Sequence, residues 1–389
     1  MAGVTEESKL KDLYDRGGLD AVTQEIQSDL NKSKSTTLHI AVTGESGTGK
    51  STFINALRGL GDDDEGAAPT GETETTMEPK MYQYPNQDKV TVWDLPGIGT
   101  PNFQASQYLE RVKFDQYDFF IILSATRFKE NDLHLAQEIQ QRKKKFYFVR
   151  SKIDHDLASS KRREKSQYNE YKTLEKLRNA CVESLRKEGL ESPQVFLISG
   201  WNLDKFDFEK LQEVLEGDLP ALKRRAFLLA LPSITASIVE KKKTVMLDEI
   251  WKIALLSAAA AAVPIPGFSI ACDISLLVGK LLSYHRYFGL DDDSIERLAK
   301  RVEKTTEELR SVIKTVFGAE VSASIVVKVL TKIAGAAMMA STVLSWLPLI
   351  GTVAAAGISY TTTYSMLKSA VEDMAEDSKR VLVKAFAVD

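Results

Sequence analysis

The sequence is poor in cysteine and has almost no excess of charge. Cys181 and Cys272 are the 2 cysteines among 389 residues, far apart and without metal-ligand spacing. This excludes a disulfide framework and a cysteine-rich metal site. The 51 basic and 54 acidic side chains leave a net charge of -3, which gives no electrostatic reason to expect nucleic acid as a partner. We therefore expect a globular protein of a reducing compartment, the cytoplasm.

Long uninterrupted apolar runs are also missing. The least polar stretches, Ile253 to Cys272 and Ile333 to Leu367, contain Pro264 and Pro348, and each half is too short to cross a bilayer, which takes about 20 apolar residues. We expect buried helices of a bundle, with shallow hairpin insertion into a membrane as the alternative. The start, Met1-Ala2-Gly3 followed by charged residues, predicts neither a signal peptide nor N-myristoylation. Any membrane contact is then expected to be peripheral.

The pattern of apolar residues divides the chain. Over residues 37–219, short apolar runs alternate with amphipathic stretches, which predicts an α/β domain with a mostly parallel sheet and helices on both faces. Strand signals vanish over residues 220–389, where long Ala-, Leu- and Lys-bearing stretches follow. Residues 1–36 also look helical and are expected to pack on that all-α domain. The helical domain is thus predicted to come from both ends of the chain.

Short runs rich in β-branched or aromatic residues predict the strands of the α/β domain. They are Leu38 to Val42, Val90 to Leu95, Phe119 to Ser124, Phe146 to Ser151 and Val195 to Ser199, with a further strand near Met81 to Tyr84. Ligands of parallel sheets bind at the carboxyl ends of the strands. The residues after each strand are therefore the candidates for a site.

A glycine-rich loop directly follows the first predicted strand. It consists of Gly44, Glu45, Ser46, Gly47, Thr48, Gly49, Lys50 and Ser51, and Thr52 opens a predicted helix that runs to Arg58. In such a loop backbone N–H groups surround phosphates, the lysine neutralises the β- and γ-phosphates and the Ser51 hydroxyl binds Mg²⁺. The strand before it and the helix after it are the context that this motif requires. We predict a P-loop nucleotide-binding domain with Lys50 as a catalytic residue.

A carboxylate and a glycine follow the strand that ends near Leu95. In the motif Asp94-Leu95-Pro96-Gly97, Asp94 can hold Mg²⁺ through water and the Gly97 N–H can reach the γ-phosphate. Alone, an Asp at a strand end is usually a cap or turn residue. Its place one strand after the phosphate loop makes it a candidate ligand.

Two later motifs concern the base. In Ser151-Lys152-Ile153-Asp154, the Asp154 carboxylate can accept hydrogen bonds from N1 and N2 of guanine, which adenine cannot donate, while the Lys152 stem lies over the ring. Ser199 and Gly200 end the last strand, in position for a backbone contact with the guanine oxygen. These motifs predict GTP as substrate and GDP as product. ATP hydrolysis is the alternative if Asp154 is only a turn residue.

A polar segment rich in Thr and Glu lies between Gly61 and Met77, where the loop that senses the γ-phosphate should fall. One threonine of this segment should complete the coordination of Mg²⁺. Thr70 and Thr76 are the leading candidates, and a plain surface loop is the alternative.

These motifs resemble the interferon-inducible immunity-related GTPases, the IRG family. The likeness is carried by Gly44 to Gly59, Glu65 to Gly71, Trp93 to Thr100, Tyr117 to Ile122, Phe146 to Lys152 and, more loosely, Tyr287 to Asp291. The resemblance implies a GTPase of cell-autonomous innate immunity that assembles when GTP-bound and acts on membranes of pathogen-containing vacuoles. Lys50 places the chain with the Lys-bearing, effector-type branch.

The same resemblance implies roles for the Thr- and Glu-rich segment. In Lys-bearing members a glutamate that matches Glu74 assists hydrolysis across a dimer, and threonines that match Thr70 and Thr76 are targets of parasite kinases. Regulation by such kinases or by other members of the family is thus implied. The Ala-rich helices after Trp251 and the missing myristoylation glycine depart from the family pattern, which leaves membrane targeting open.

The residue after the Asp-x-x-Gly motif bears on the mechanism. Ras-like switches carry a glutamine there to orient the attacking water, but here Ile98 occupies the position, and its side chain neither donates nor accepts a hydrogen bond. We predict slow intrinsic hydrolysis that speeds up as two nucleotide faces pair. A docking module, in which GTP licenses partner binding with little hydrolysis, is the alternative.

Overall fold

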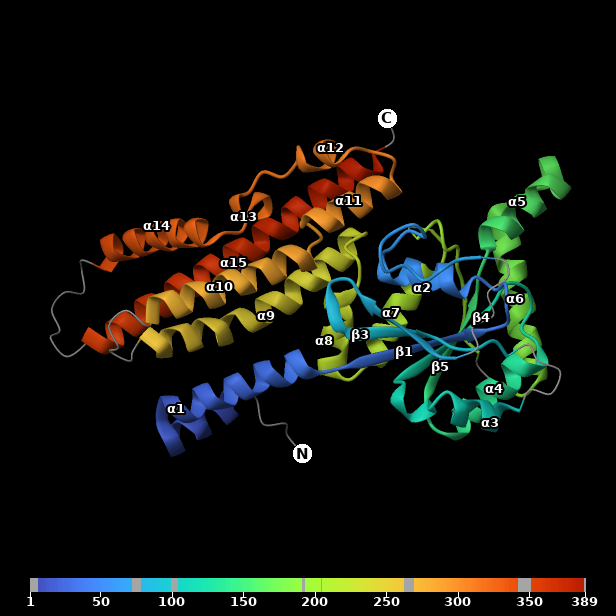
Figure 1. Ribbon diagram of the computed structural model, residues 1–389, viewed down its shortest axis with the longest axis horizontal. Coiled ribbons are helices and arrows are strands. Elements are labelled where there is room, and N and C mark those ends of the chain that lie inside the picture. Colours follow the sequence, from blue (N-terminus) through green and yellow to red (C-terminus); the bar gives the residue numbers. More distant parts are fainter. Residues whose placement is uncertain are drawn as a thin grey trace. The chain divides into compact units, whose positions relative to one another are not determined.

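The computed structural model describes residues 6–71, 78–98, 104–190, 193–203, 205–261, 269–341 and 351–387. They form two compact units, Thr36–Pro232, and Met1–Ser35 together with Ser233–Asp389; Figure 1 shows the first as a sheet with helices and the second as helical. The helix α8 (Ala221–Ala230) belongs to the first unit because it packs on the sheet. The expected boundary at residue 220 is therefore corrected to Pro232.

The first unit is built around a sheet of 6 strands in the order β2-β3-β1-β4-β5-β6. All neighbours are parallel except β2 and β3, which are antiparallel. The strands are β1 (Leu38–Gly44), β2 (Lys80–Tyr84), β3 (Gln87–Asp94), β4 (Phe119–Ser124), β5 (Lys145–Arg150) and β6 (Val195–Leu197). The predicted α/β P-loop fold with a mostly parallel sheet is confirmed.

Three predicted strands are longer than the observed ones at their carboxyl ends, the first of them by one residue, since β3 ends at Asp94 rather than Leu95. β5 ends at Arg150 rather than Ser151, and β6 ends at Leu197 rather than Ser199. In both cases the serine Oγ bonds to the loops instead: that of Ser151 donates to the Thr48 carbonyl, and that of Ser199 accepts from the Trp201 N–H. These serines therefore begin the loops that carry the candidate site.

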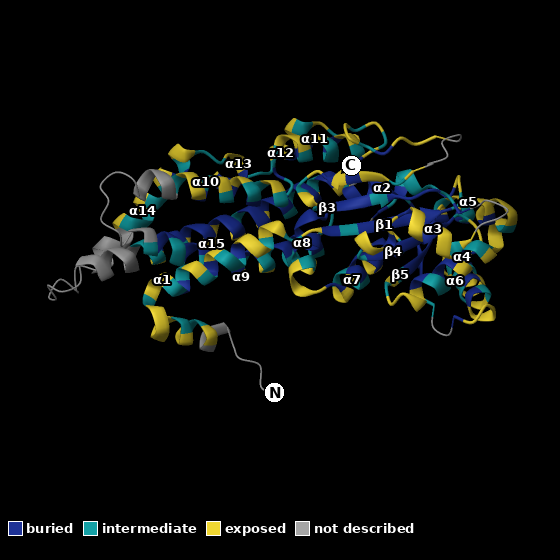
Figure 2. Cartoon of the chain, turned by 60° about the horizontal axis from the view of Figure 1, so that its bottom comes forward, coloured by how far each residue is buried: buried dark blue, intermediate teal, exposed yellow. Residues whose placement is uncertain are grey.

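Helices cover both faces of this sheet. They are α2 (Lys50–Arg58), α3 (Ala105–Arg111), η1 (Phe114–Gln116), α4 (Glu130–Gln141), α5 (Ile153–Glu164), η2 (Lys165–Gln167), α6 (Glu170–Lys187), α7 (Phe208–Asp218) and α8. Figure 2 shows β1, β4 and β5 as mostly buried and α5 and α6 as partly exposed. Each of these helices except η2 buries at least one apolar side chain, as an amphipathic pattern predicts.

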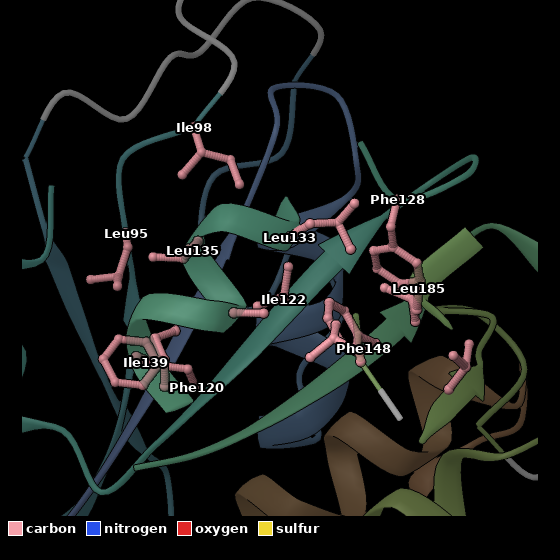
Figure 3. Close-up of a cluster of buried hydrophobic side chains, with 14 of the residues drawn as sticks. Leu95, Ile98, Phe120, Ile122, Phe128, Leu133, Leu135, Ile139, Phe148 and Leu185 are labelled. Carbon is pink, nitrogen blue, oxygen red and sulfur yellow. The ribbon is translucent and has the colours of Figure 1, made fainter. Parts of the chain in front are cut away.

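One face of the sheet carries a large apolar cluster, drawn in Figure 3. Phe120 and Ile122 of β4 point to this face because alternate residues of a strand share a side. They pack with Leu135 and Ile139 of α4, which lie four residues apart on one stripe of the helix. Burial of such side chains stabilises the fold by about 1.5–3 kcal/mol each.

The second unit consists of helices from both ends of the chain. They are α1 (Glu6–Ser35), α9 (Ala236–Ala261), α10 (Ser269–Tyr287), α11 (Asp292–Arg301), α12 (Thr306–Arg310), α13 (Val316–Ala319), α14 (Ala323–Ser341) and α15 (Gly351–Phe386). α15 packs along α9, and Val22, Ile26 and Leu30 of α1 pack on Trp251 and its neighbours in α9. Within the described ranges, every helix falls short of the length and apolar content needed to span a bilayer. The predicted breakers Pro264 and Pro348 lie outside those ranges.

The helix α1 is broken near its middle. Gly18 has φ 65° and ψ -156°, which is not helical and which glycine adopts at low cost. Beyond this break the first segment folds back, since Lys9 Nζ lies 2.5 Å from a carboxylate oxygen of Glu25. The predicted N-terminal helix is thus two helical segments.

Lys242 of α9 is fully buried. Its Nζ donates to the Tyr287 carbonyl at 2.6 Å and to the Ser233 Oγ at 3.0 Å. Burial lowers the pKa of Lys242 to about 7, although Asp291 acts in the opposite direction. A lysine in this position makes the stability of the helical unit depend on pH.

We expect the Lys242→Met variant to lose part of this pH dependence. The ordinary pKa of lysine is 10.5, so between pH 7 and 10 the unfolded state binds more protons than the folded state. The free energy of unfolding therefore rises with pH, by up to ~1.4 kcal/mol per unit. Urea unfolding at pH 7 and pH 9 should show a rise larger in the wild type by about 2 kcal/mol. The exposed Lys328→Met is the control. An equal rise in the wild type and in Lys242→Met would contradict the assigned pKa of Lys242.

Candidate nucleotide-binding site

The phosphate loop connects β1 to α2 and depends on glycine at three positions. Gly44, Gly47 and Gly49 have φ values of 145°, 78° and 84°, which side-chain-bearing residues rarely adopt. A Cβ at Gly44 would also lie 2.2 Å from the Leu123 carbonyl oxygen on β4. Gly49 is the N-cap of α2 and provides no side-chain cap. The N–H groups at this helix start are therefore left for an anion.

Lys50 begins α2 and bends back over the loop. Its Nζ donates to the carbonyl oxygens of Gly44 and Glu45, each at 3.1 Å. Burial lowers the pKa of Lys50, and the nearby charge of Asp94 opposes this effect. The ammonium group is thus held at the loop by two weak neutral acceptors, which the oxygens of a polyphosphate can replace.

The candidate Mg²⁺ ligands lie at the ends of neighbouring strands. Asp94 ends β3 and is buried, and it pairs in register with Val42 of β1. Ser51 lies in the first turn of α2. A carboxylate and a hydroxyl oxygen are the donors that Mg²⁺ prefers, so these residues fit the ion, which in such a site neutralises charge on the phosphates. Thr70 is described and exposed, whereas Glu74 and Thr76 lie outside the described residues.

Gly97 borders the phosphate loop from the β3 side. A Cβ at this position would lie 3.6 Å from the Gly44 carbonyl oxygen and from the Ser46 nitrogen. The next residue, Ile98, is fully buried, and its carbonyl accepts from the Asn131 Nδ2 at 2.6 Å. The glycine thus lies beside the phosphate loop, its contact with the γ-phosphate stays a prediction, and the isoleucine side chain is turned into the core.

Asp154 lies after β5, in the first turn of α5. Its Oδ1 is buried, and nothing in the described part of the chain donates a hydrogen bond to it; the other oxygen, Oδ2, lies 3.7 Å from the His155 Nε2. A buried acceptor without a donor is costly. The N1–H and N2–H groups of guanine would satisfy this carboxylate, so Asp154 fits the base.

The loops that carry the base motifs are tied to the phosphate loop. The Ser151 Oγ donates to the Thr48 carbonyl at 2.7 Å, and Ile153 N donates to the Ile198 carbonyl at 3.3 Å. A Cβ at Gly200 would lie 2.9 Å from the Thr52 Cγ2. The structure therefore brings the four predicted motifs to one edge of the sheet, while their nucleotide contacts remain predictions.

Sequence reasoning missed the start of α4 as part of this edge. Lys129 Nζ lies 2.5 Å from a carboxylate oxygen of Glu45 in the phosphate loop. Asp132 is buried, which raises its pKa to about 6, and it accepts from the Lys129 N–H at 2.8 Å. No motif marks these residues, because only the fold places them beside the phosphate loop.

We expect the Ser151→Ala variant to bind GDP several-fold more weakly. In the wild type the Ser151 Oγ joins the loop after β5 to the phosphate loop through the Thr48 carbonyl, and it also bonds to the Ser124 carbonyl at 3.3 Å. Loss of a buried hydrogen bond of this kind costs about 1 kcal/mol, so the melting temperature should also fall by a few degrees. Calorimetric titration and thermal unfolding measure both effects, with Ser159→Ala on the exposed side of α5 as the control. Unchanged affinity would show that the link does not position the site.

The comparison with known proteins agrees with these motifs. Residues 6–385 match the family model described as Interferon-inducible GTPase (IIGP). The chain is 42% identical over 381 residues to Interferon-inducible GTPase 5 of Rattus norvegicus, covering 98% of this chain and 82% of that protein. It is 41% identical over 300 residues to Interferon-inducible GTPase 1 of Mus musculus, covering 77% of this chain and 73% of that one. The resemblance read from the sequence is confirmed: the chain belongs to the interferon-inducible GTPase family and is a GTP-hydrolysing enzyme.

Proposed function

We propose that this GTPase is a self-assembling, dynamin-like enzyme of cell-autonomous innate immunity that acts at the membranes of pathogen-containing vacuoles. The immune role is supported by the names of the relatives, which call them interferon-inducible. Self-assembly is supported by the chemistry of the nucleotide site. Membrane action follows from the resemblance of the motifs to the IRG family.

The buried Ile98 is the observation that carries the self-assembly proposal. The side chain after Gly97 points into the core, and its backbone is fixed by Asn131. A water molecule that attacks the γ-phosphate is therefore not oriented from this position. The missing group must come from another loop, such as the one that contains Glu74, or from a second copy of the chain.

The rim of the phosphate loop has charges suited to pairing with a second copy. Lys129 and Glu45 form an ion pair in which the lysine side chain keeps 54% of its surface exposed. In a two-fold interface each patch meets its own copy. A patch that carries both signs is self-complementary, because each lysine can meet the glutamate of the other copy.

The test is GTP turnover per molecule over a roughly hundredfold range of protein concentration. We expect turnover to rise with concentration for GTP and to be absent for ATP. The Lys129→Glu variant should flatten the rise when turnover is measured at saturating GTP, where a change in nucleotide affinity does not affect the rate. Lys187→Glu is the matched control, since it lies at the end of α6, which leads to the opposite edge of the sheet. Flat specific activity in the wild type would refute self-assembly.

A second candidate function is a GTP-dependent docking module with little hydrolysis of its own. The same Ile98 favours it, because a site without a water-orienting group holds GTP for long periods. Co-sedimentation with liposomes separates the candidates. GTP-dependent pelleting supports peripheral membrane action, whereas no pelleting together with flat turnover favours the docking module.

We also propose that kinases regulate the enzyme at Thr70 and Thr76. Thr70 is exposed. Two residues before it, the Ala68 N–H donates to the Asn55 Oδ1 at 2.7 Å. A phosphate there adds negative charge beside the expected Mg²⁺ ligands. The Thr70→Glu variant should therefore bind GTP more weakly than Thr70→Ala in a titration with Mg²⁺. Equal affinities would argue against this control point.

A further inference from the structure

Trp201 follows the Ser199-Gly200 turn directly, and 65% of its surface is exposed. Single exposed apolar residues are common on protein surfaces, so the exposure alone carries no meaning. The position of Trp201 does carry meaning, because the Ser199-Gly200 turn before it lies at the edge of the sheet where the nucleotide motifs meet.

The turn before Trp201 is held in place on both sides. The Ser199 Oγ is buried and accepts from the backbone N–H groups of Trp201 and Asn202, each at 3.3 Å. Gly200 lies against the first turn of α2, since a Cβ there would lie 2.9 Å from the Thr52 Cγ2. The backbone of Trp201 is thus one residue away from the helix that follows the phosphate loop.

The place of the guanine ring follows from the groups around it. The Asp154 Oδ1 is a buried acceptor that no described residue satisfies. The Asp154 loop is joined to the Trp201 loop by the hydrogen bond from Ile153 N to the Ile198 carbonyl. The Lys152 stem lies along the phosphate loop, because its Cε is 3.7 Å from a Cβ built at Gly49. The loop that carries Trp201 is therefore the neighbour of the loop that would hold the edge of the ring.

We propose that the indole of Trp201 stacks on the face of the bound guanine ring. A purine face is a flat π surface, and stacking on tryptophan removes apolar area of both partners from water. Asp154 reads the edge of the base and so provides selectivity for guanine. Stacking is tolerant of base identity, so Trp201 provides affinity and positions the ring without changing that selectivity.

The proposal predicts a specific pattern of affinities. The Kd for GDP is measured at a protein concentration far below that of the assembly assay. It should rise about tenfold in Trp201→Ala. It should rise by less than about threefold in Trp201→Phe, which keeps an aromatic face. The Kd for IDP should rise by the same factor as that for GDP, because the two bases share the ring and differ at the edge. The control Trp251→Phe lies in α9 against α1 and should bind as the wild type.

Intrinsic fluorescence gives an independent reading. GDP should quench tryptophan emission in the wild type, and Trp201→Phe should lose this quenching while it still binds GDP. Wild-type affinity in Trp201→Ala, or quenching that persists in Trp201→Phe, would overturn the proposal. If affinity is unchanged but the rise of turnover with concentration is lost, Trp201 contacts a second copy instead and the stacking proposal is wrong. Self-assembly itself is judged by the wild-type turnover curve, so the two proposals fail separately.

Discussion

Replacing Lys50 with alanine should lower the rate of GTP hydrolysis at least a hundredfold. The ammonium group begins α2 and lies 3.1 Å from the carbonyl oxygens of Gly44 and Glu45, at the loop where the β- and γ-phosphates are expected. Charge builds up on those phosphates in the transition state, and removal of one pre-placed donor typically costs 10² to 10³ in rate. We also expect the substitution to weaken the binding of GTP more than the binding of GDP, since GTP carries the additional γ-phosphate.

The same substitution should not destabilise the nucleotide-free protein. Burial already lowers the pKa of Lys50, so the folded state bears a desolvation cost that alanine removes, and the lost contacts are to two carbonyls only. Turnover by phosphate release and thermal unfolding without nucleotide measure both effects, with Lys143→Ala on the α4–β5 turn as the control. Turnover within tenfold of the wild type would mean that another cation does the work assigned to Lys50.

The motifs at the strand ends were predictable from sequence because each has a local backbone requirement. Gly44 and Gly49 need φ values that other residues rarely adopt, and the runs that form β1, β4 and β5 are too apolar to lie at the surface. The predicted strand β4 matches the observed one, and the others differ by three residues or fewer at either end. Local chemistry therefore predicted where the strands and the glycine-rich loop lie, while the nucleotide contacts stay predictions.

The features that were missed depend on contacts between distant residues. Lys129 lies beside the phosphate loop only because α4 packs on β4 and β5. α8 looks like any other helix in the sequence, and its contact with β3 decides which unit it joins. The close approach of Gly200 to Thr52 likewise joins two segments that are far apart in the sequence. Periodicity and motif spacing contain no information about such neighbours.

Replacing Asp154 with asparagine should weaken the binding of GTP at least a hundredfold and create a preference for xanthine nucleotides. Its buried Oδ1 has no donor within the described ranges, so guanine N1–H and N2–H are the groups that would satisfy it. Asparagine places an N–H donor against one of those donors, and a site built for a hydrogen bond rejects a mismatched edge by large factors. Xanthine carries an oxygen where guanine has its amino group, so it accepts from the new amide.

Competitive titration of GDP and XDP, followed by turnover of GTP and XTP, measures this change of specificity. The control Asp88→Asn lies near the amino end of β3, away from the carboxyl edge where the nucleotide motifs meet. Because Trp201 contacts the ring face under the stacking proposal, Asp154→Asn should leave its quenching by XDP intact. Unchanged preference for GDP in Asp154→Asn would show that another group reads the base, and the unsatisfied Oδ1 would then need a different ligand.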